Sequence, residues 1–200
     1  MVEDQIKRRG VTDKNVLHAM ETVPRHLFVD EKEQRIAYYD SPLPIGEGQT
    51  ISQPYIVAFM TEFLELNPNH KVLEIGTGCG YQSAILSLLA KKVVSIEYVE
   101  KLANSAKRRL IEMGYSNIHV HYANGYFGWT ADAPYDRIIC TAAPTKIPEK
   151  LIEQLSPNGI MILPVGVNPF NQSLYIIKKD LQGKVSKERS LGVRFVPMIK

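Results

Sequence analysis

The chain has 200 residues, of which 44% are hydrophobic and 22% are charged, and its formal net charge is +3. This length fits one domain with one substantial core, the composition excludes a disordered or collagen-like chain, and the charge is too small to require a nucleic-acid or membrane partner. Two cysteines without metal-ligand spacing, no apolar run long enough for a membrane span and no signal-peptide core lead us to expect a cytoplasmic protein without a disulfide or a metal site.

The N-terminal third is predicted to be helical at both ends and irregular in the middle. Short helices are expected over 2–9 and 12–22, and Thr12 is predicted to cap the second. Residues 40–53 contain several prolines and glycines, which exclude a long regular element. Apolar residues at amphipathic spacing then predict a helix over about 54–66.

From residue 71 onward, short apolar runs alternate with helical stretches. The predicted strands are 72–75, 93–97, 118–122, 137–140 and 160–163, and the predicted helices are 81–90, 101–113 and 148–155. Strands that alternate with helices favour a parallel sheet covered on both faces. Two further strands, 173–178 and 193–198, are expected to flank a polar loop around Lys184 and to add an antiparallel pair to this sheet.

A glycine-rich loop leaves the first of these strands and opens a helix. Glycines stand at alternate positions from Gly76 to Gly80, so the backbone can turn tightly and a ligand can approach it closely. Glu97 ends the next strand, where a carboxylate would meet a ribose diol. The spacing is GxGxG, which disfavours an NAD-binding oxidoreductase, and no P-loop motif is present. We therefore expect an adenosine ligand without phosphates, which points to S-adenosylmethionine; the alternative is a glycine-rich turn that binds nothing.

Asn124 and Gly125 follow the third strand of this sheet. Open parallel sheets bind ligands beyond the carboxyl ends of their strands. Asn124 is therefore a candidate to accept a hydrogen bond from an adenine amino group, with the Gly125 backbone against the ring. The simpler alternative is an ordinary Asn-Gly turn.

The segment from Gly46 to Pro54 offers a candidate site for the methyl acceptor. It carries hydroxyl side chains at Thr50 and Ser52, and the helix N-terminus that follows favours an anion. A carboxylate acceptor has a pKa of about 3.3–4.3, so at pH 7 it needs orientation and no general base. From local sequence alone, a plain N-cap role for Ser52 is the simpler interpretation, and the two roles are compatible.

The chain lacks the residues that two other methyl-acceptor chemistries require. Enzymes that methylate amino groups of bases or glutamine often carry Asn/Asp-Pro-Pro-aromatic after the fourth strand, where this chain has Cys-Thr-Ala-Ala-Pro at 140–144. Methylation of cytosine C5 needs an exposed thiolate, whereas Cys140 lies in a strand predicted to be buried. A carboxylate acceptor is left as the best match.

Several motifs occur in a fixed order along nearly the whole chain. They are Val23–Val29, Pro42–Pro54, Val72–Gln82, Gly128–Trp129, Ala133–Asp136, Thr141–Pro144, Pro164–Gly166 and Val193–Pro197. Together they resemble the protein-L-isoaspartate (D-aspartate) O-methyltransferase family, and the segment 42–54 is the most specific signature.

The resemblance implies an α/β fold of the Rossmann-like class I S-adenosylmethionine-dependent methyltransferases, with a mostly parallel sheet, helices on both faces and a C-terminal antiparallel strand pair. We expect one domain over 1–200, with an N-terminal helical cover and acceptor loop (1–66), a cofactor-binding core (71–166) and C-terminal strands (173–200). The implied reaction methylates the free α-carboxylate of L-isoaspartyl residues, with D-aspartyl residues as a further candidate. The methyl ester would then collapse to a succinimide without the enzyme.

The resemblance also assigns roles to individual residues. Ser52 would be catalytic and orient the acceptor carboxylate, and Val196 would contact the substrate through its backbone. The implied cofactor-binding residues are Gln49, Thr50, Ile51, Gly76, Thr77, Gly78, Glu97, Tyr98, Asn124 and Gly125. Cys79 replaces the usual Ser or Ala and is small enough that cofactor binding should be retained. Asn124 replaces the usual Asp and lacks its charge, so a modest loss of cofactor affinity is expected.

Two alternatives stay open at this point, a methyltransferase that acts on another small-molecule acceptor and a non-catalytic adenosine-binding module. The expected partners are isoaspartyl-containing proteins and peptides, with no nucleic acid, membrane or metal. The sequence leaves the oligomeric state open, with a monomer slightly favoured.

Overall fold

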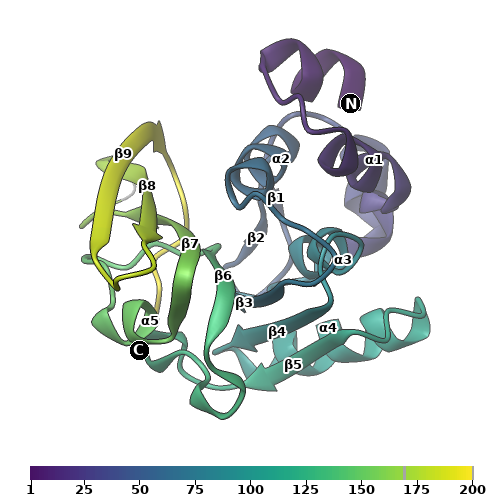
Figure 1. Ribbon diagram of the computed structural model, residues 1–200. Coiled ribbons are helices and arrows are strands. Elements are labelled where there is room, and N and C mark those ends of the chain that lie inside the picture. The colour runs from purple at the N-terminus through teal and green to yellow at the C-terminus, as the bar shows by residue number, and fades with distance from the viewer. Residues whose placement is uncertain (169, 200) are drawn as a thin grey trace.

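A seven-stranded sheet forms the centre of the computed structural model, which describes residues 1–168 and 170–199 (Figure 1). The strands are β3 (Lys71–Ile75), β4 (Lys92–Glu97), β5 (Ile118–Tyr122), β6 (Tyr135–Cys140), β7 (Leu155–Val165), β8 (Gln172–Lys179) and β9 (Val185–Val193). Their spatial order is β5-β4-β3-β6-β7-β8-β9, with parallel pairing from β5 to β7 and antiparallel pairing of β8 and β9. The predicted mostly parallel sheet with an antiparallel pair is confirmed.

Helices cover both faces of this sheet. They are α1 (Lys14–Thr22), α2 (Pro54–Phe63), α3 (Tyr81–Ser87), α4 (Glu100–Glu112) and α5 (Glu149–Glu153). Short helical turns span Val2–Ile6, Lys7–Arg9, Arg25–Phe28, Glu31–Ile36, Gly125–Phe127 and Thr130–Asp132, and a small hairpin pairs β1 (Leu43–Pro44) with β2 (Thr50–Ile51). In Figure 1 the purple N-terminal turns and α1 lie beside α2, far from the yellow β9. Within the described residues, no helix is long and apolar enough to cross a membrane.

The side chains of the parallel strands alternate between two apolar clusters. Val72 belongs to the cluster that contains Met60 of α2, whereas its neighbour Leu73 belongs to the cluster that contains Leu151 of α5. Because both faces of β3, β4 and the middle of β7 are buried, these segments are rich in apolar residues, whereas β5 at the sheet edge has only Val120 buried. The apolar runs therefore located β3 to β7 in the sequence, with differences only at their ends.

The last predicted strand is wrong. β8 pairs antiparallel with β7 on one side and with β9 on the other. β9 covers residues predicted as a polar loop, and 194–198 leave the sheet. The turn between β8 and β9 lies at 180–184, where Asp180 Oδ1 accepts hydrogen bonds from the N–H groups of Gln182 and Lys184. β9 is an edge strand with mostly exposed, charged side chains, so its sequence lacks the apolar alternation that marks a strand.

The N-terminal helix boundaries also differ from the prediction. Residues 2–9 form a π-helical turn (Val2–Ile6) followed by a 3-10 turn (Lys7–Arg9). The cap of α1 is Asp13, whose Oδ1 accepts from the N–H groups of Asn15 and Val16. The Thr12 N–H donates instead to the Glu62 carboxylate of α2, 2.6 Å away. Thr12, which the local sequence favoured as the cap of α1, therefore makes a tertiary contact with α2 instead.

A buried carboxyl group supports the carboxyl end of β3 from beneath. Glu74 is fully buried, and its Oε2 accepts hydrogen bonds from the hydroxyl groups of Ser83 and Ser95. Its Oε1 has no hydrogen-bond partner among the described residues. Burial outweighs these hydrogen bonds and raises the pKa of Glu74 to about 7.

The raised pKa predicts a pH-dependent stability that a Glu74→Gln variant would lack. The folded state binds the Glu74 proton more tightly than the unfolded state, so this stabilisation is complete below the ordinary pKa of 4.5 and is lost as pH rises through about 7. The full effect is on the order of 3 kcal/mol. Urea unfolding of both proteins between pH 5 and 8 measures it, and wild-type stability is expected to fall relative to the variant. Parallel pH curves would contradict the prediction.

Candidate active site

A pocket of about 770 Å³, including its open mouth, lies at the carboxyl ends of β3 and β4. The strand order reverses at β3, and ligands of open parallel sheets bind at such a point. The pocket is lined by Gln49–Ser52, Ile75–Cys79, Ile96–Tyr98 and Val196–Ile199, together with Val57, Tyr81, Gln82, Gly125, Thr141 and Ala142.

All but one of the predicted site residues line this pocket. Those brought together are Gln49, Thr50, Ile51, Ser52, Gly76, Thr77, Gly78, Glu97, Tyr98, Gly125 and Val196. The exception is Asn124, whose Oδ1 accepts a 3.0 Å hydrogen bond from the Tyr126 N–H and so begins a short helical turn. This is the Asn-Gly turn named above as the alternative, and a contact of Asn124 with adenine stays a prediction.

The glycine loop forms a bare backbone wall of the pocket. Gly76 has a φ of +99°, and a Cβ atom built there would collide with the hydroxyl of Thr141. A Cβ atom on Gly125 would likewise collide with Ile75. Glycine at these two positions lets the backbone pack directly against its neighbours. The resulting backbone wall, together with the Glu97 carboxylate, fits an adenosyl group.

Glu97 fixes the loop and keeps acceptor capacity. Its Oε2 accepts a 2.7 Å hydrogen bond from the Gly78 N–H, and its Oε1 accepts a 2.9 Å bond from the Val99 N–H. Its side chain is nearly buried and lines the pocket. Each carboxylate oxygen has two lone pairs, so both can accept a second hydrogen bond, for example from a ribose diol.

Thr141 is a site residue that the sequence reasoning missed. Its hydroxyl donates to the Gly76 carbonyl, 2.6 Å away, and its N–H donates to the Ile75 carbonyl at 2.8 Å. The signal for it was its position directly after β6, next to β3 at the ligand-binding edge of the sheet. Thr141 thus ties the start of the glycine loop to the neighbouring strand and lines the pocket as well.

A second and wider pocket, of about 1210 Å³, adjoins the first. It is lined by Pro42, Thr50, Ser52, Gln53, Ile56, Thr141, Phe170, Gln172, Gly192, Val193, Arg194, Phe195 and Val196. Thr50, Ser52, Thr141 and Val196 line both pockets. A small ligand in the first pocket and a larger one in the second would meet at these residues.

Ser52 has a free hydroxyl at this junction. The plain N-cap interpretation is wrong, because Gln53 occupies the N-cap position of α2 and no side chain at that position caps the helix. Within the described residues the Ser52 hydroxyl makes no hydrogen bond, and Ser52 is half-buried. Its hydroxyl is therefore available to a ligand that reaches the junction.

Neither cysteine offers a reactive thiolate: Cys79 lines the first pocket, but burial raises the pKa of its thiol. Cys140 is fully buried in β6, and burial raises the pKa of its thiol, which disfavours a thiolate nucleophile. Over residues 1–168 and 170–199, no three His, Cys, Asp or Glu side chains are grouped so as to hold a metal ion. The site therefore offers hydroxyl, carboxylate and backbone groups.

Comparison with known proteins identifies the family that this chain resembles. The model of the protein-L-isoaspartate(D-aspartate) O-methyltransferase family matches residues 1–200. A protein-L-isoaspartate O-methyltransferase of Picosynechococcus sp. is 50% identical over 198 residues, which cover 99% of this chain and 88% of that protein. A protein of the same name from Methanosarcina mazei is 53% identical over 192 residues, covering 94% and 78%.

Solved structures agree with the sequence relatives. A structure described as a beta-aspartate methyltransferase from Plasmodium falciparum, in complex with S-adenosyl-L-homocysteine, superposes with a TM-score of 0.82 at 26% identity, over 96% of this chain and 94% of that one. Another, called a protein-L-isoaspartate O-methyltransferase, gives a TM-score of 0.86 at 30% identity over 96% of this chain and 62% of that one. The chain belongs to the protein-L-isoaspartate(D-aspartate) O-methyltransferase family.

Proposed function

We propose that this protein methylates the free α-carboxylate of L-isoaspartyl residues in damaged proteins and peptides, with S-adenosylmethionine as co-substrate. The observation that carries the proposal is the position of Ser52, whose unbonded hydroxyl lies where a narrow pocket meets a wider one. The narrow pocket fits an adenosyl group, and the wider one has room for a peptide segment. Family membership favours this acceptor over another small molecule, and the intact junction favours an enzyme over a binding module.

The residues of the chain would bind and align the reactants. S-adenosylmethionine supplies a methyl group that its sulfonium already activates. The acceptor carboxylate is ionised at neutral pH, so no residue has to remove a proton. Ser52 would donate a hydrogen bond to the carboxylate oxygen that does not attack, and the Val196 backbone would contact the peptide. Alignment and exclusion of water are then the main contributions of the protein.

We also propose that the chain acts as a single domain in the cytoplasm, without a nucleic-acid or membrane partner. The small net charge of +3 supports this setting. Both cysteines are free and buried, which suits a reducing compartment.

Replacement of Ser52 by Ala should lower turnover of an isoaspartyl peptide roughly 10- to 100-fold, since a hydrogen bond to a charged group is worth about 1.5–3 kcal/mol. Transfer of a labelled methyl group to the peptide measures turnover, and the same peptide with a normal aspartyl residue is the negative control. Affinity for S-adenosylhomocysteine, measured by calorimetry, should persist. Wild-type turnover in the variant would defeat the role of Ser52, and equal labelling of both peptides would defeat the proposed acceptor.

Replacement of Glu97 by Ala should weaken binding of S-adenosylhomocysteine at least about 10-fold, because both the ribose acceptor and the anchor of the Gly78 N–H are lost. Titration calorimetry measures the dissociation constant. Glu100→Ala is the matched control, since Glu100 is an exposed acid three residues further along that does not line the pocket. Unchanged affinity in the Glu97 variant would rule out the proposed contact.

A further inference from the structure

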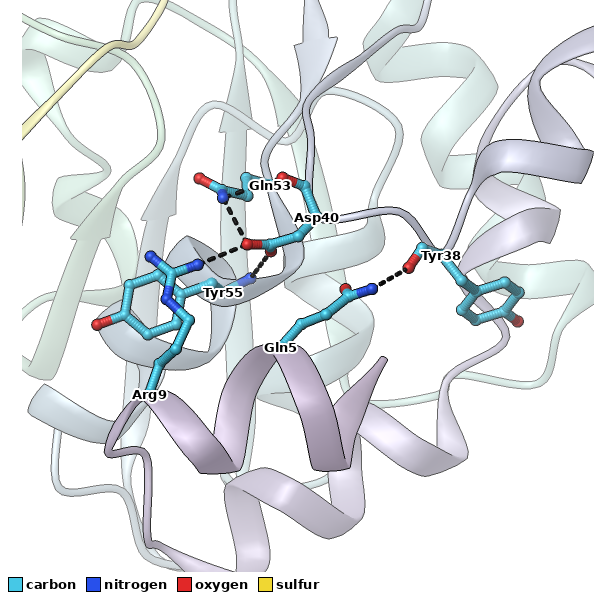
Figure 2. Close-up of polar contacts among 6 residues, drawn as sticks. All are labelled: Gln5, Arg9, Tyr38, Asp40, Gln53 and Tyr55. Atoms are coloured by element: carbon cyan, nitrogen blue, oxygen red, sulfur yellow. Dashed lines mark hydrogen bonds and ion pairs between the residues drawn. The ribbon is translucent and has the colours of Figure 1, made fainter.

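The carboxylate of Asp40 binds the residues that follow Ser52 in the chain. Figure 2 shows Asp40 facing Arg9, Gln53 and Tyr55. Asp40 Oδ2 accepts hydrogen bonds from Gln53 Nε2 at 2.7 Å and from Arg9 Nη1 at 2.5 Å, and Oδ1 accepts from the Tyr55 N–H at 3.1 Å. Gln53 Nε2 also donates to the Asp40 carbonyl, 3.0 Å away. A single residue thus binds both the side chain that follows Ser52 and the helix beyond it.

Ser52 is held from two sides by this arrangement. On one side, β2 ends at Ile51, which pairs with Leu43 across the small hairpin. On the other side is Gln53, whose side chain is fixed by Asp40. Ser52 itself has no hydrogen bond of its own within the described residues, so its place at the junction depends on these two neighbours.

An aspartate suits this position because α2 lacks a cap of its own. The helix begins at Pro54, and Gln53 at the N-cap position provides no capping side chain. Asp40, 15 residues earlier in the chain than Tyr55, accepts the N–H of Tyr55 instead. A negative charge at a helix N-terminus is also stabilised by the helix dipole.

Arg9 completes the group from the N-terminal turn Lys7–Arg9. Its guanidinium lies over the Tyr55 ring, 3.5 Å from the ring centroid, and pairs with Asp40. The Arg9 side chain is 46% exposed, whereas that of Asp40 is 21% exposed. A half-exposed ion pair contributes little by itself, so Arg9 mainly balances the charge of Asp40.

We propose that Asp40 is a positioning residue for methyl transfer, which acts by holding Gln53 and the start of α2 so that the Ser52 hydroxyl stays at the junction of the two pockets. This inference rests on the proposed function, because it concerns the same reaction. It assigns Asp40 no contact with either substrate, and Asp40 lines neither pocket.

A double-mutant cycle between Asp40 and Ser52 tests the proposal. Asp40→Ala should lower kcat at least about 10-fold in the wild-type background, since a displacement of about 1 Å at a reacting group can cost 100-fold. In the Ser52→Ala background the same change should cost less than about 2-fold, because the group that Asp40 positions is already gone. Turnover is expressed per site that binds S-adenosylhomocysteine in calorimetry, so that loss of folded protein does not count as loss of catalysis.

Glu62→Ala is the matched control. The Glu62 carboxylate lies on the same helix and accepts the N–H groups of Thr12 and Asp13 at 2.6 and 2.7 Å, but it lines neither pocket. Its loss should lower the melting temperature and leave turnover per binding site within about 2-fold of wild type. Equal costs of Asp40→Ala in both backgrounds, or an equal effect of Glu62→Ala, would overturn the proposal.

The outcomes separate this inference from the proposed function. If wild-type protein does not methylate the isoaspartyl peptide, the proposed function fails. If wild type is active and Asp40→Ala matches it, only the role of Asp40 fails. Should Asp40→Ala not fold, the cycle is run with Gln53→Met, which removes the contact beside Ser52 and leaves the bonds of Asp40 to Arg9 and Tyr55. Additive effects in that cycle would equally overturn the proposal.

Discussion

Hydrogen bonds between the end of β3 and the ends of its two neighbouring strands hold the site together. The Gly76 N–H donates to the Ile96 carbonyl at the end of β4, 2.8 Å away, and the Thr141 N–H after β6 donates to the Ile75 carbonyl at 2.8 Å. These bonds continue the parallel pairing one step beyond the strands, so the glycine loop starts from a fixed point. Glu97 and Thr141 then bind the loop from either side, through Gly78 and Gly76. A loop made of flexible residues is in this way given one conformation.

The buried polar groups under the loop extend the same arrangement into the core. The Thr77 hydroxyl lies 2.6 Å from the Ser95 hydroxyl, and Ser95 in turn donates to Glu74. Thr77 lines the first pocket, so a chain of hydrogen bonds connects the pocket wall to a carboxyl group that is fully buried. Buried polar networks are costly when they are incomplete, which makes their geometry specific. The protonation of Glu74 is therefore linked to the hydrogen bonds beneath the glycine loop.

The sequence predicted the elements whose conformation depends on residues close together in the chain. β3, β4 and the middle of β7 are buried on both faces and rich in apolar residues, and Gly76 of the glycine loop stands where a Cβ atom would collide, so both were visible in the sequence. β9 was not visible, because its pairing with β8 comes from its place at the sheet edge and not from its own side chains. Asp40 was missed for a similar reason, since its partners lie 13 to 31 residues away and no short motif connects them.

The junction of the two pockets is built from segments that lie far apart in the chain. Ser52 comes from the segment between β2 and α2, Thr141 from the end of β6, and Val196 from the segment after β9. The Val196 carbonyl accepts the Ala143 N–H, and the Met198 N–H donates to the Ala143 carbonyl, each at 2.9 Å, so this last segment is tied to the residues that follow β6. The glycine loop is tied to the same residues through Thr141. The walls of both pockets are therefore attached to the same strand end, the end of β6, which fixes the position of one pocket relative to the other.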